Sequence, residues 1–466
     1  MCRSSPYFAL TVLLGLLLSH TVSAGPNHAR ALGLSLKFYE AQRSGKLPDR
    51  DVPWRRDAFT KERTADGRDA TGGFFDAGDH VRFMLPQATT LTILAHGLID
   101  FQGGYRAAGL YTKGARVLKW GADFLKRCVL GRDRIVGQIG LGGPDHAVWV
   151  RPDEIRQPYP VLELNPQKPG SDVAGSMAAA LAAASIALNS SAYLKAAETA
   201  FAFGVRYPGR YDASIGDASG FYKSSSCYDD LALGAAWLYR ATRNPQYLRQ
   251  AKSLLETNLR VEKLGWPSVD WDNVQRMAMI VLSAVDRDSR SKHAGAIDTF
   301  KKAWTRGQDG VGVTPRGLRW LAKWGPLRYN GNALYAILAH AKSARDQKTY
   351  RDAVCFARSQ AAYLLGANPG GRSYMVGYGP KYPQRPHHRA ASCPLPPAPC
   401  GWEWFDRDAP NPNVLLGAIV GGPGLDDSYA DRRDDYIRNE VAIDYNAGWT
   451  SALAGLSEPA ARAVVC

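Results

Sequence analysis

The stretch GSDVAGSMAAALAAASIAL, residues 170–188, decides the fold class that this sequence predicts. It begins with Ser171-Asp172, a pair typical of the start of a helix, and then runs almost entirely through strong helix formers. A long alanine-rich helix is therefore expected here.

The same helical pattern recurs along the chain. Residues 228–259 predict two helices that break at Asn244-Pro245, because the residue before a proline is disfavoured in a helix. Further helices are expected at 271–285, 331–344 and 350–369, where apolar residues recur at three- and four-residue spacing. Alternating runs of β-branched residues are scarce, so an all-α fold is expected.

The long connections between these helices are rich in Gly, Pro, Trp and His residues. The connections lie at 72–90, 137–170, 263–275, 309–332 and 368–440. Many alanine-rich helices with chemically rich loops on one face predict a ring of paired helices, an α/α barrel. A helical solenoid is the alternative, although no fixed repeat length emerges.

The first 24 residues have the pattern of a secretory signal peptide. Arg3 precedes the apolar run ALTVLLGLLL (9–18), and Val22-Ser23-Ala24 offers a cleavage site before Gly25. No later run is long and apolar enough to cross a membrane. The net charge of +15 is spread thinly rather than clustered, which argues against nucleic acid as a partner. A secreted, soluble protein with a basic surface is expected.

Cysteine usage fits an oxidising compartment. Six cysteines follow the leader and allow 15 connectivities, among which the sequence does not choose; they are Cys128, Cys227, Cys355, Cys393, Cys400 and Cys466. Cys393 and Cys400 flank the loop PLPPAP, where a local bridge is plausible. No CxxC or HExxH motif indicates zinc. Asn189-Ser190-Ser191 is an N-glycosylation sequon.

Two aspartates stand three positions apart in GGFFDAGDH (72–80). An EF-hand calcium loop starting at Asp76 would need Glu at its twelfth position, which is Gln87. A turn or cap role is the common reading of such a pair. The alternative is that Asp76 and Asp79 jointly hold and deprotonate one water molecule, titrating as a unit. Such a base needs a distant acid.

Glu440 is the candidate acid. It stands beside Val441-Ala442 and five residues before Tyr445, and apolar surroundings favour the protonated form of a carboxyl. A surface glutamate on an amphipathic helix is the alternative.

A further polar segment lies between the aspartates and Glu440. Adjacent His387 and His388 would point in opposite directions on an extended chain, so they would not chelate one metal. His387 and Arg389 would share a face and could bind a polar substrate.

These motifs resemble glycoside hydrolase family 9, the endo-β-1,4-glucanases, and the secreted invertebrate digestive (termite-type) enzymes more than the plant ones. The similarity covers nearly the whole chain after the leader. The matching segments are FYEAQRSGKLP (38–48), TGGFFDAGDHVRF (71–83), DHAVWVRP (145–152), PGSDVAGSMAAALAAAS (169–185), GAAWLYRAT (234–242), WGPLRY (324–329), RPHHRAASCP (385–394), NPNVLLGAIVGGP (411–423) and NEVAIDYNAGW (439–449).

The resemblance implies a role for each matched residue. Asp79 would be the catalytic base, Asp76 would help to hold the attacking water, and Glu440 would be the general acid. His387 and Arg389 would bind sugar hydroxyls, and Asp431 would support the region of the acid. The remaining cleft residues would be His146, Trp149, Trp324, Arg328 and Tyr445.

The family implies an (α/α)6 barrel, no catalytic cofactor, a monomeric enzyme and inversion at the anomeric carbon, with the two carboxyl groups about 6.5–9.5 Å apart. Residues 25–466 would form a single catalytic domain, leaving none for a carbohydrate-binding module. The expected substrate is therefore soluble or amorphous β-1,4-glucan rather than crystalline cellulose.

Departures from the family pattern lie close to the base. His80 and Met84 replace the usual residues after Asp79, which puts the rate and pH optimum in question. Some relatives bind structural calcium, and the resemblance leaves such an ion open here although the usual Glu is the shorter Asp230; the matching residues are Ser225, Ser226, Asp229, Asp230 and Asp272. A glucan-binding protein without activity and a helical scaffold are the alternatives from other functional classes.

Overall fold

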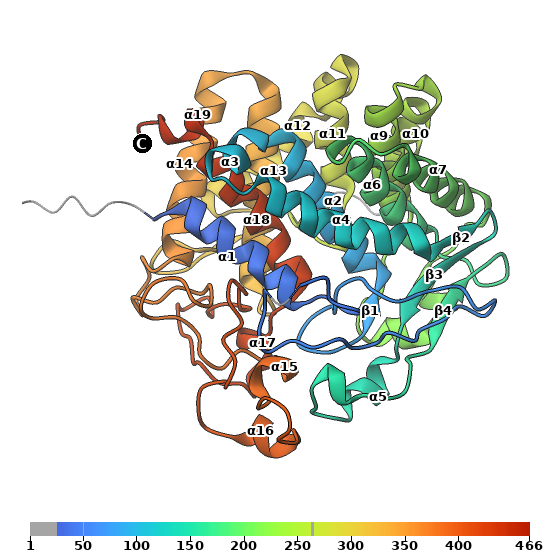
Figure 1. Cartoon of the computed structure of the whole chain (residues 1–466). Helices are drawn as coiled ribbons and strands as arrows, with labels where there is room; N and C mark the ends of the chain where they lie inside the picture. Colours follow the sequence, from blue (N-terminus) through green and yellow to red (C-terminus); the bar gives the residue numbers. More distant parts are fainter. Residues whose placement is uncertain (1–25, 50, 262–264) are drawn as a thin grey trace, which may run out of the picture.

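The computed structural model describes residues 26–49, 51–261 and 265–466. The predicted signal peptide, residues 1–24, lies outside them. Within the described residues, six helices form an inner ring in which each packs on the next (Figure 1). In ring order they are α2 (Met84–Asp100), α6 (Ser171–Ala187), α9 (Tyr228–Thr242), α11 (Gln275–Val285), α13 (Pro326–Ala344) and α18 (Ile443–Ser457). Because α18 packs back on α2, the ring is closed and the solenoid is excluded.

A second layer of helices covers the outside of the ring. Each inner helix except α18 is followed along the chain by an outer one that packs on it; α1 completes the layer by packing on α18. The outer helices are α1 (His28–Ala41), α4 (Tyr111–Cys128), α7 (Ser191–Arg206), α10 (Pro245–Val261), α12 (Arg287–Arg306) and α14 (Gln347–Leu364). This is the (α/α)6 barrel that the sequence predicts.

Side-chain chemistry separates the two layers. Residues 171–185 of α6 are all buried, whereas α4 buries an apolar stripe and exposes Arg116, Lys119 and Arg127, as a helix at a surface does. Small residues let the inner helices approach closely. A Cβ added to Gly175 would lie 2.5 Å from the carbonyl carbon of Asp230, so α6 and α9 could not pack this way with a larger residue.

The predicted helices are all present, with limits that lie within about five residues of those in the structure. The predicted break is confirmed, since α9 ends at Thr242 and α10 begins at Pro245. The start of α6 differs in detail, because Gly170 is its N-cap. The Ser171 hydroxyl instead donates to the carbonyl of Gly204 at 2.8 Å, tying α6 to α7.

Most of the short elements lie in the connections that enter the inner helices, and two short helices instead follow the C-terminal ends of inner helices. Strand β3 (Arg134–Ile139) pairs antiparallel with β1 (Arg82–Phe83), β2 (Val129–Gly131) and β4 (Val161–Leu164). A separate ribbon joins β5 (Gly312–Val313) to β6 (Arg319–Trp320). The short helices are α3 (Gln102–Ala107), α5 (Gly142–His146), α8 (Tyr211–Ser214), α15 (Arg389–Ser392), α16 (Trp402–Asp406), α17 (Tyr436–Asn439) and α19 (Pro459–Arg462), with 3-10 turns at Pro152–Glu154 and Gly216–Gly220.

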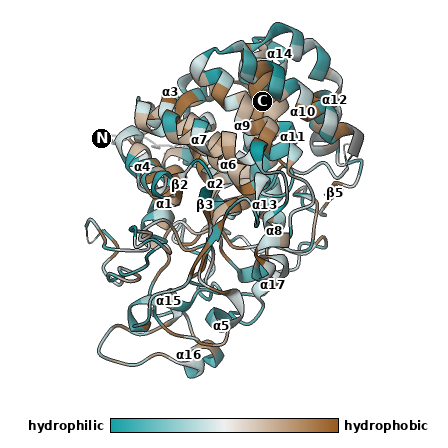
Figure 2. Cartoon of the chain, turned by 90° about the vertical axis from the view of Figure 1, so that its right-hand side faces the viewer, coloured by the Kyte–Doolittle hydropathy of each residue, from teal (hydrophilic) through white to brown (hydrophobic). Residues whose placement is uncertain are grey.

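The connections that enter the inner helices are long, and those that leave them are short. Figure 2 shows the helices gathered at one end of the molecule and the long connections at the other. The entering connections are residues 42–83, 129–170, 207–227, 262–274, 307–325 and 365–442. Every inner helix therefore points its N-terminus at the same, loop-covered end.

Two disulfides link cysteines of the described chain. Cys393 is bonded to Cys400 across the Pro-rich loop, and Cys355 of α14 is bonded to Cys466 near the chain end. Cys128 and Cys227 are free thiols. None of the described helices is both long and apolar enough to cross a membrane. The sequon residue Asn189 is exposed in the turn between α6 and α7.

Candidate active site

A cavity of about 350 Å³ opens at the loop-covered end of the ring. All six entering connections contribute to its wall. The lining side chains include Asp76, Asp79, Phe83, His146, Phe221, Tyr222, Trp271, Trp324, Arg328, His387, Arg389, Glu440 and Tyr445. Segments that are far apart in sequence, and that carry the predicted site residues, thus meet at one place.

The turn that carries the aspartates rests directly on the histidine segment. A Cβ added to Gly78 would lie 2.3 Å from the carbonyl oxygen of His387, so the backbones approach too closely for any other residue. The backbone N–H of Arg389 donates to the carbonyl of Gly78 at 3.1 Å, and that of Ile443 donates to Asp76 at 2.9 Å. The turn is therefore fixed both to the histidine segment and to the start of α18.

Asp76 and Asp79 influence each other's charge. Burial, followed by the negative charge of Asp145, raises the pKa of Asp79 to about 6. Burial and then the charge of Asp79 raise the pKa of Asp76 well above its ordinary value. The hydroxyl of Tyr222 donates to Asp76 Oδ2, while Asp76 Oδ1 is buried without a partner among the described residues. In such a pair, a state with one ionised and one protonated carboxyl group is strongly favoured over a state in which both are ionised.

Glu440 is held at the end of α17 by two aromatic donors. Trp324 Nε1–H donates to Oε2 at 2.7 Å, and the hydroxyl of Tyr445 donates to the same oxygen at 3.0 Å. Burial nevertheless raises the pKa of Glu440 to about 7. This carboxyl therefore keeps a proton at pH values where an ordinary glutamate has lost it.

His387 and His388 point in opposite directions, as the sequence predicts. His388 turns into the core, where its Nε2 contacts the side-chain oxygen of Gln42 at 2.8 Å. His387 lines the cavity, and its Nδ1–H donates to the carbonyl of Arg433 at 2.8 Å. Burial lowers the pKa of His387 to about 4, so the imidazole is neutral and its Nε2 is a hydrogen-bond acceptor.

The predicted cationic residues also lie at the cavity wall. Arg389 is ion-paired with Asp145, and Arg328 lies 3.3 Å from the carboxylate of Asp444. His146 is half-exposed, and its Nδ1–H donates to the carbonyl of Gly142 at 2.7 Å, leaving Nε2 available.

Two of the predicted residues do not reach the cavity. Trp149 is 2% exposed, packs edge-on against the ring of His387 and donates to Ser392. It therefore supports His387 rather than stacking on a sugar. Asp431 accepts the backbone N–H groups of Gln384 (2.8 Å) and Arg385 (3.0 Å). It stabilises the chain that leads to His387 and makes no contact with Glu440.

Four aromatic lining residues escaped the sequence analysis: Phe83, Phe221, Tyr222 and Trp271. Tyr222 and Trp271 pack edge to face with centroids 4.9 Å apart, although they enter from different connections. Phe83 and Trp271 stand in connections that the sequence predicts, 72–90 and 263–275, whereas Phe221 and Tyr222 stand outside all the predicted connections. The substituted His80 does not line the cavity; it is buried between Phe59 and Phe75.

The predicted calcium residues gather only in part. Ser225, Ser226, Asp229 and Asp272 line a second cavity of about 300 Å³, which Asp270 and Asn273 also line. Asp230 does not line it, because its carboxyl accepts a hydrogen bond from Ser176 at 2.6 Å.

Another set of possible metal-binding side chains lies at the first cavity. The ligand atoms of Asp79, Asp145 and His146 are within 4.8 Å of one another. Both oxygens of Asp145 are already bound, by Arg389 and by the hydroxyl of Tyr159, so this arrangement is an ion-pair network rather than a metal centre.

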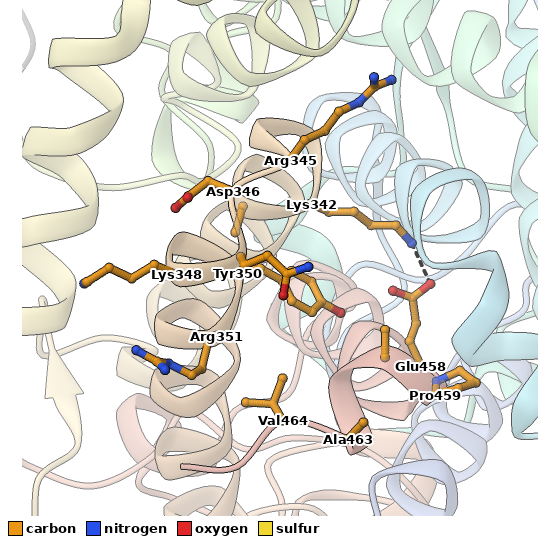
Figure 3. A pocket seen from close by; sticks show the side chains of 13 residues that line it. Lys342, Arg345, Asp346, Lys348, Tyr350, Arg351, Glu458, Pro459, Ala463 and Val464 are labelled. Atoms are coloured by element: carbon orange, nitrogen blue, oxygen red, sulfur yellow. Dashed lines mark hydrogen bonds and ion pairs between the residues drawn. The ribbon is translucent and has the colours of Figure 1, made fainter.

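A larger cavity of about 990 Å³ lies at the opposite end of the barrel, between α13, α14 and α19 (Figure 3). Both of its acids have structural roles. Glu458 pairs with Lys342 at 2.6 Å, and Asp346 caps α14 by accepting the N–H of Thr349 at 2.7 Å. The smaller cavity therefore remains the candidate for catalysis.

Comparisons with known proteins agree with this site. Residues 28–453 match the model of glycosyl hydrolase family 9. Endoglucanase 15 of Arabidopsis thaliana is 37% identical over 479 residues, covering 94% of this chain and 96% of the relative. A solved endoglucanase of the termite Nasutitermes takasagoensis is 41% identical with a TM-score of 0.87, covering 93% of this chain and 99% of that one. Endoglucanase CelQ of Clostridium thermocellum, solved with cellobiose and cellotriose, is 36% identical with a TM-score of 0.80. The match covers 93% of this chain and 71% of the CelQ chain.

The match spans all six helix pairs and the connections that build the cavity. The likeness to the termite enzyme also agrees with the resemblance noted in the sequence. This chain therefore belongs to glycosyl hydrolase family 9, and it is a glycoside hydrolase of the endo-1,4-β-glucanase class.

Proposed function

We propose that this enzyme is secreted and cleaves internal β-1,4-glucosidic bonds with inversion, Asp79 acting as general base and Glu440 as general acid. One observation carries the proposal. Both carboxyl groups line one cavity, and burial raises the pKa of Asp79 to about 6 and that of Glu440 to about 7. The two values differ in the direction that leaves the base ionised and the acid protonated at the same pH.

The reaction follows from these protonation states. Glu440 gives its proton to the glycosidic oxygen as the bond from that oxygen to the anomeric carbon breaks. A water molecule on the other face of the ring forms the new bond to that carbon and gives a proton to Asp79. Asp76, whose Oδ1 has no hydrogen-bond partner within the described part of the chain, is placed to orient this water. Catalysis by these carboxyl groups requires no cofactor.

Aromatic and polar groups of the wall suit a glucose chain. Tyr222, Trp271 and Trp324 line this wall, and aromatic rings can pack against the C–H faces of pyranose rings. Neutral His387 accepts a sugar hydroxyl through Nε2, and Arg389 donates to another. CelQ, whose structure holds cellobiose and cellotriose, supports a β-glucan substrate.

We propose soluble or amorphous glucan as the preferred form, because a chain packed in a crystal cannot enter a cavity of about 350 Å³ without being lifted out of its lattice. The leader pattern of residues 1–24 supports secretion. After export, exposed Asn189 would be a glycan acceptor.

Product stereochemistry tests the inverting mechanism. Proton NMR recorded within the first minutes of hydrolysis of a soluble cello-oligosaccharide should show the α-anomer at the new reducing end, followed by slow mutarotation. Inversion is expected because the base works through a water molecule and forms no glycosyl-enzyme bond. An initial excess of the β-anomer would contradict the proposal, and a folded protein that releases no sugar would favour a glucan-binding role.

We also propose a structural calcium site in the cavity of about 300 Å³. Its support is the donor set: Asp229 Oδ1 and Asn273 Oδ1 are buried without a partner among the described residues, and Asp272 lines the same cavity. Oxygen donors of this kind suit Ca²⁺.

Calcium at a hundred times its Kd should stabilise the fold by about 2.7 kcal/mol. The measurement is the thermal unfolding temperature with added CaCl₂ or EGTA. The Asp272→Asn variant should lose the response, and Asp298→Asn, an exposed acid on α12, is the control. An unfolding temperature that ignores calcium in the unmodified protein would refute the site.

A further inference from the structure

Asp145, in the short helix α5, is a buried carboxylate beside the cavity that the proposed mechanism does not yet use. Its side chain is fully buried, although it stands next to half-exposed His146. A buried charge is costly unless it is paired and hydrogen-bonded, so its contacts indicate what it does.

Three groups from separate connections converge on this carboxylate. Arg389 of α15 forms an ion pair with Oδ2, and the hydroxyl of Tyr159 donates to Oδ1 at 2.6 Å. His80, the residue after the proposed base, contacts it twice: its backbone N–H lies 3.4 Å from Oδ2 and its Nδ1 lies 3.4 Å from Oδ1. Asp145 thus ties the aspartate turn to the histidine segment.

Asp145 carries a full negative charge. Burial opposes ionisation, but the contacts with His80, Arg389 and Tyr159 outweigh it and hold the pKa of Asp145 well below its ordinary value. The charge stays next to Asp79 throughout the working pH range.

The charges around Asp79 act in opposite directions. After burial, the charge of Asp145 is the main cause that raises the pKa of Asp79, whereas His146 and Arg389 lower it. Arg389 alone beside the base would stabilise the ionised carboxylate and make it a poor proton acceptor. The other titratable or charged groups that face Asp79 from the packed elements are Asp76, Tyr159, His387 and Glu440.

We infer that Asp145 is a positioning residue of the reaction: it holds Arg389 against the substrate cavity and cancels the charge of Arg389 at Asp79, so that Asp79 stays basic enough to take a proton from water. The inference rests on the proposed role of Asp79 as base. It assigns the segment DHAVWVRP a second function beyond that of His146.

The Asp145→Asn variant tests the inference through the pH dependence of kcat/KM. Removing the charge of Asp145 takes away the repulsion that raises the pKa of Asp79, and it also leaves the positive charge of Arg389 unbalanced. Both effects lower the pKa of Asp79. The acid limb should move down by about 1 unit or more. The alkaline limb, set by Glu440, should stay in place, because Asp145 is not among the causes that shift the pKa of Glu440. KM should rise by about tenfold, because Arg389 loses a charge-assisted hydrogen bond.

Tyr159→Phe is the matched control. It removes a hydrogen bond to the same carboxylate but keeps the charge, so its acid limb should remain where the unmodified enzyme has it. A purely structural role of Asp145 would make the two variants behave alike, with unfolding temperatures lowered and both limbs unmoved. Such a result, or a folded Asp145→Asn enzyme with an unmoved acid limb, overturns the inference.

Arg389→Gln provides an independent test if Asp145→Asn does not fold. This substitution leaves the negative charge of Asp145 unbalanced beside Asp79, so the acid limb should move to higher pH. A limb that stays in place or moves to lower pH overturns the inference. Asp79→Asn separates the two hypotheses: if that variant keeps its activity, the proposed base is wrong. If it is inactive while Asp145→Asn shows no shift, only the role of Asp145 fails.

Discussion

Replacing Glu440 by Gln should lower kcat on cello-oligosaccharides by about 10²–10⁴-fold, the range that general acid catalysis supplies. The amide keeps the shape of the side chain and can still meet Trp324 and Tyr445, but it has no proton to give to a poor leaving group. The measurement is the rate of reducing-sugar release beside that of the unmodified enzyme.

An activated substrate makes this test specific. The dinitrophenolate of dinitrophenyl cellobioside leaves without a proton, so Glu440→Gln should cleave this substrate nearly as fast as the unmodified enzyme. The variant should also lose the fall in activity above pH about 7, because that fall reports ionisation of Glu440. Asp434→Asn, on the same loop but exposed, is the control. Equal losses on both substrates would show that Glu440 is not the acid.

Replacing Asp79 by Asn should be at least as damaging, but here the loss should not depend on the leaving group. The base activates water whatever the leaving group is, so kcat should fall by about 10²–10⁴-fold on natural and activated substrates alike. The unmodified enzyme should lose activity below pH about 6, where Asp79 becomes protonated. The release of reducing sugar measures hydrolysis of the natural substrate, and the release of dinitrophenolate measures hydrolysis of the activated one.

Azide should partly rescue Asp79→Asn. The anion needs no base, and it can form a bond to the anomeric carbon from the face that water uses, giving an α-glycosyl azide detectable by mass spectrometry. Exposed Asp69→Asn, on the same connection, should behave like the unmodified enzyme. A variant of Asp79 that still hydrolyses natural substrate normally would remove this residue from the mechanism.

The sequence predicts the barrel well because its evidence is local. Alanine-rich composition, apolar spacing and the break at Asn244-Pro245 each act within a few residues, and α9 and α10 end and begin where these signals stand. The pairing of Cys355 with Cys466 could not be predicted in this way, since it joins positions 111 residues apart that meet only when the ring has closed.

The sequence predicts which motifs form the site, but it does not predict the contacts that their side chains make. Asp79 and Glu440 stand in motifs that belong to a series of family motifs found in order along nearly the whole chain. Trp149 stands in one too, yet spacing does not reveal that its ring is buried against His387. Asp230 likewise turns to Ser176 on a neighbouring helix. Tyr222 reaches Asp76 across 146 positions, a contact set by how two loops pack.

The common orientation of the inner helices has an electrostatic consequence. Peptide dipoles align along a helix and leave a partial positive charge at its N-terminus, which stabilises a nearby anion by about 0.3–1 kcal/mol. In this ring α2, α6, α18 and their three companions all turn that positive end toward the cavity. These backbone dipoles therefore help the barrel to hold several carboxyl groups close together. In a fold with alternating helix directions, side-chain cations alone would have to neutralise this negative charge.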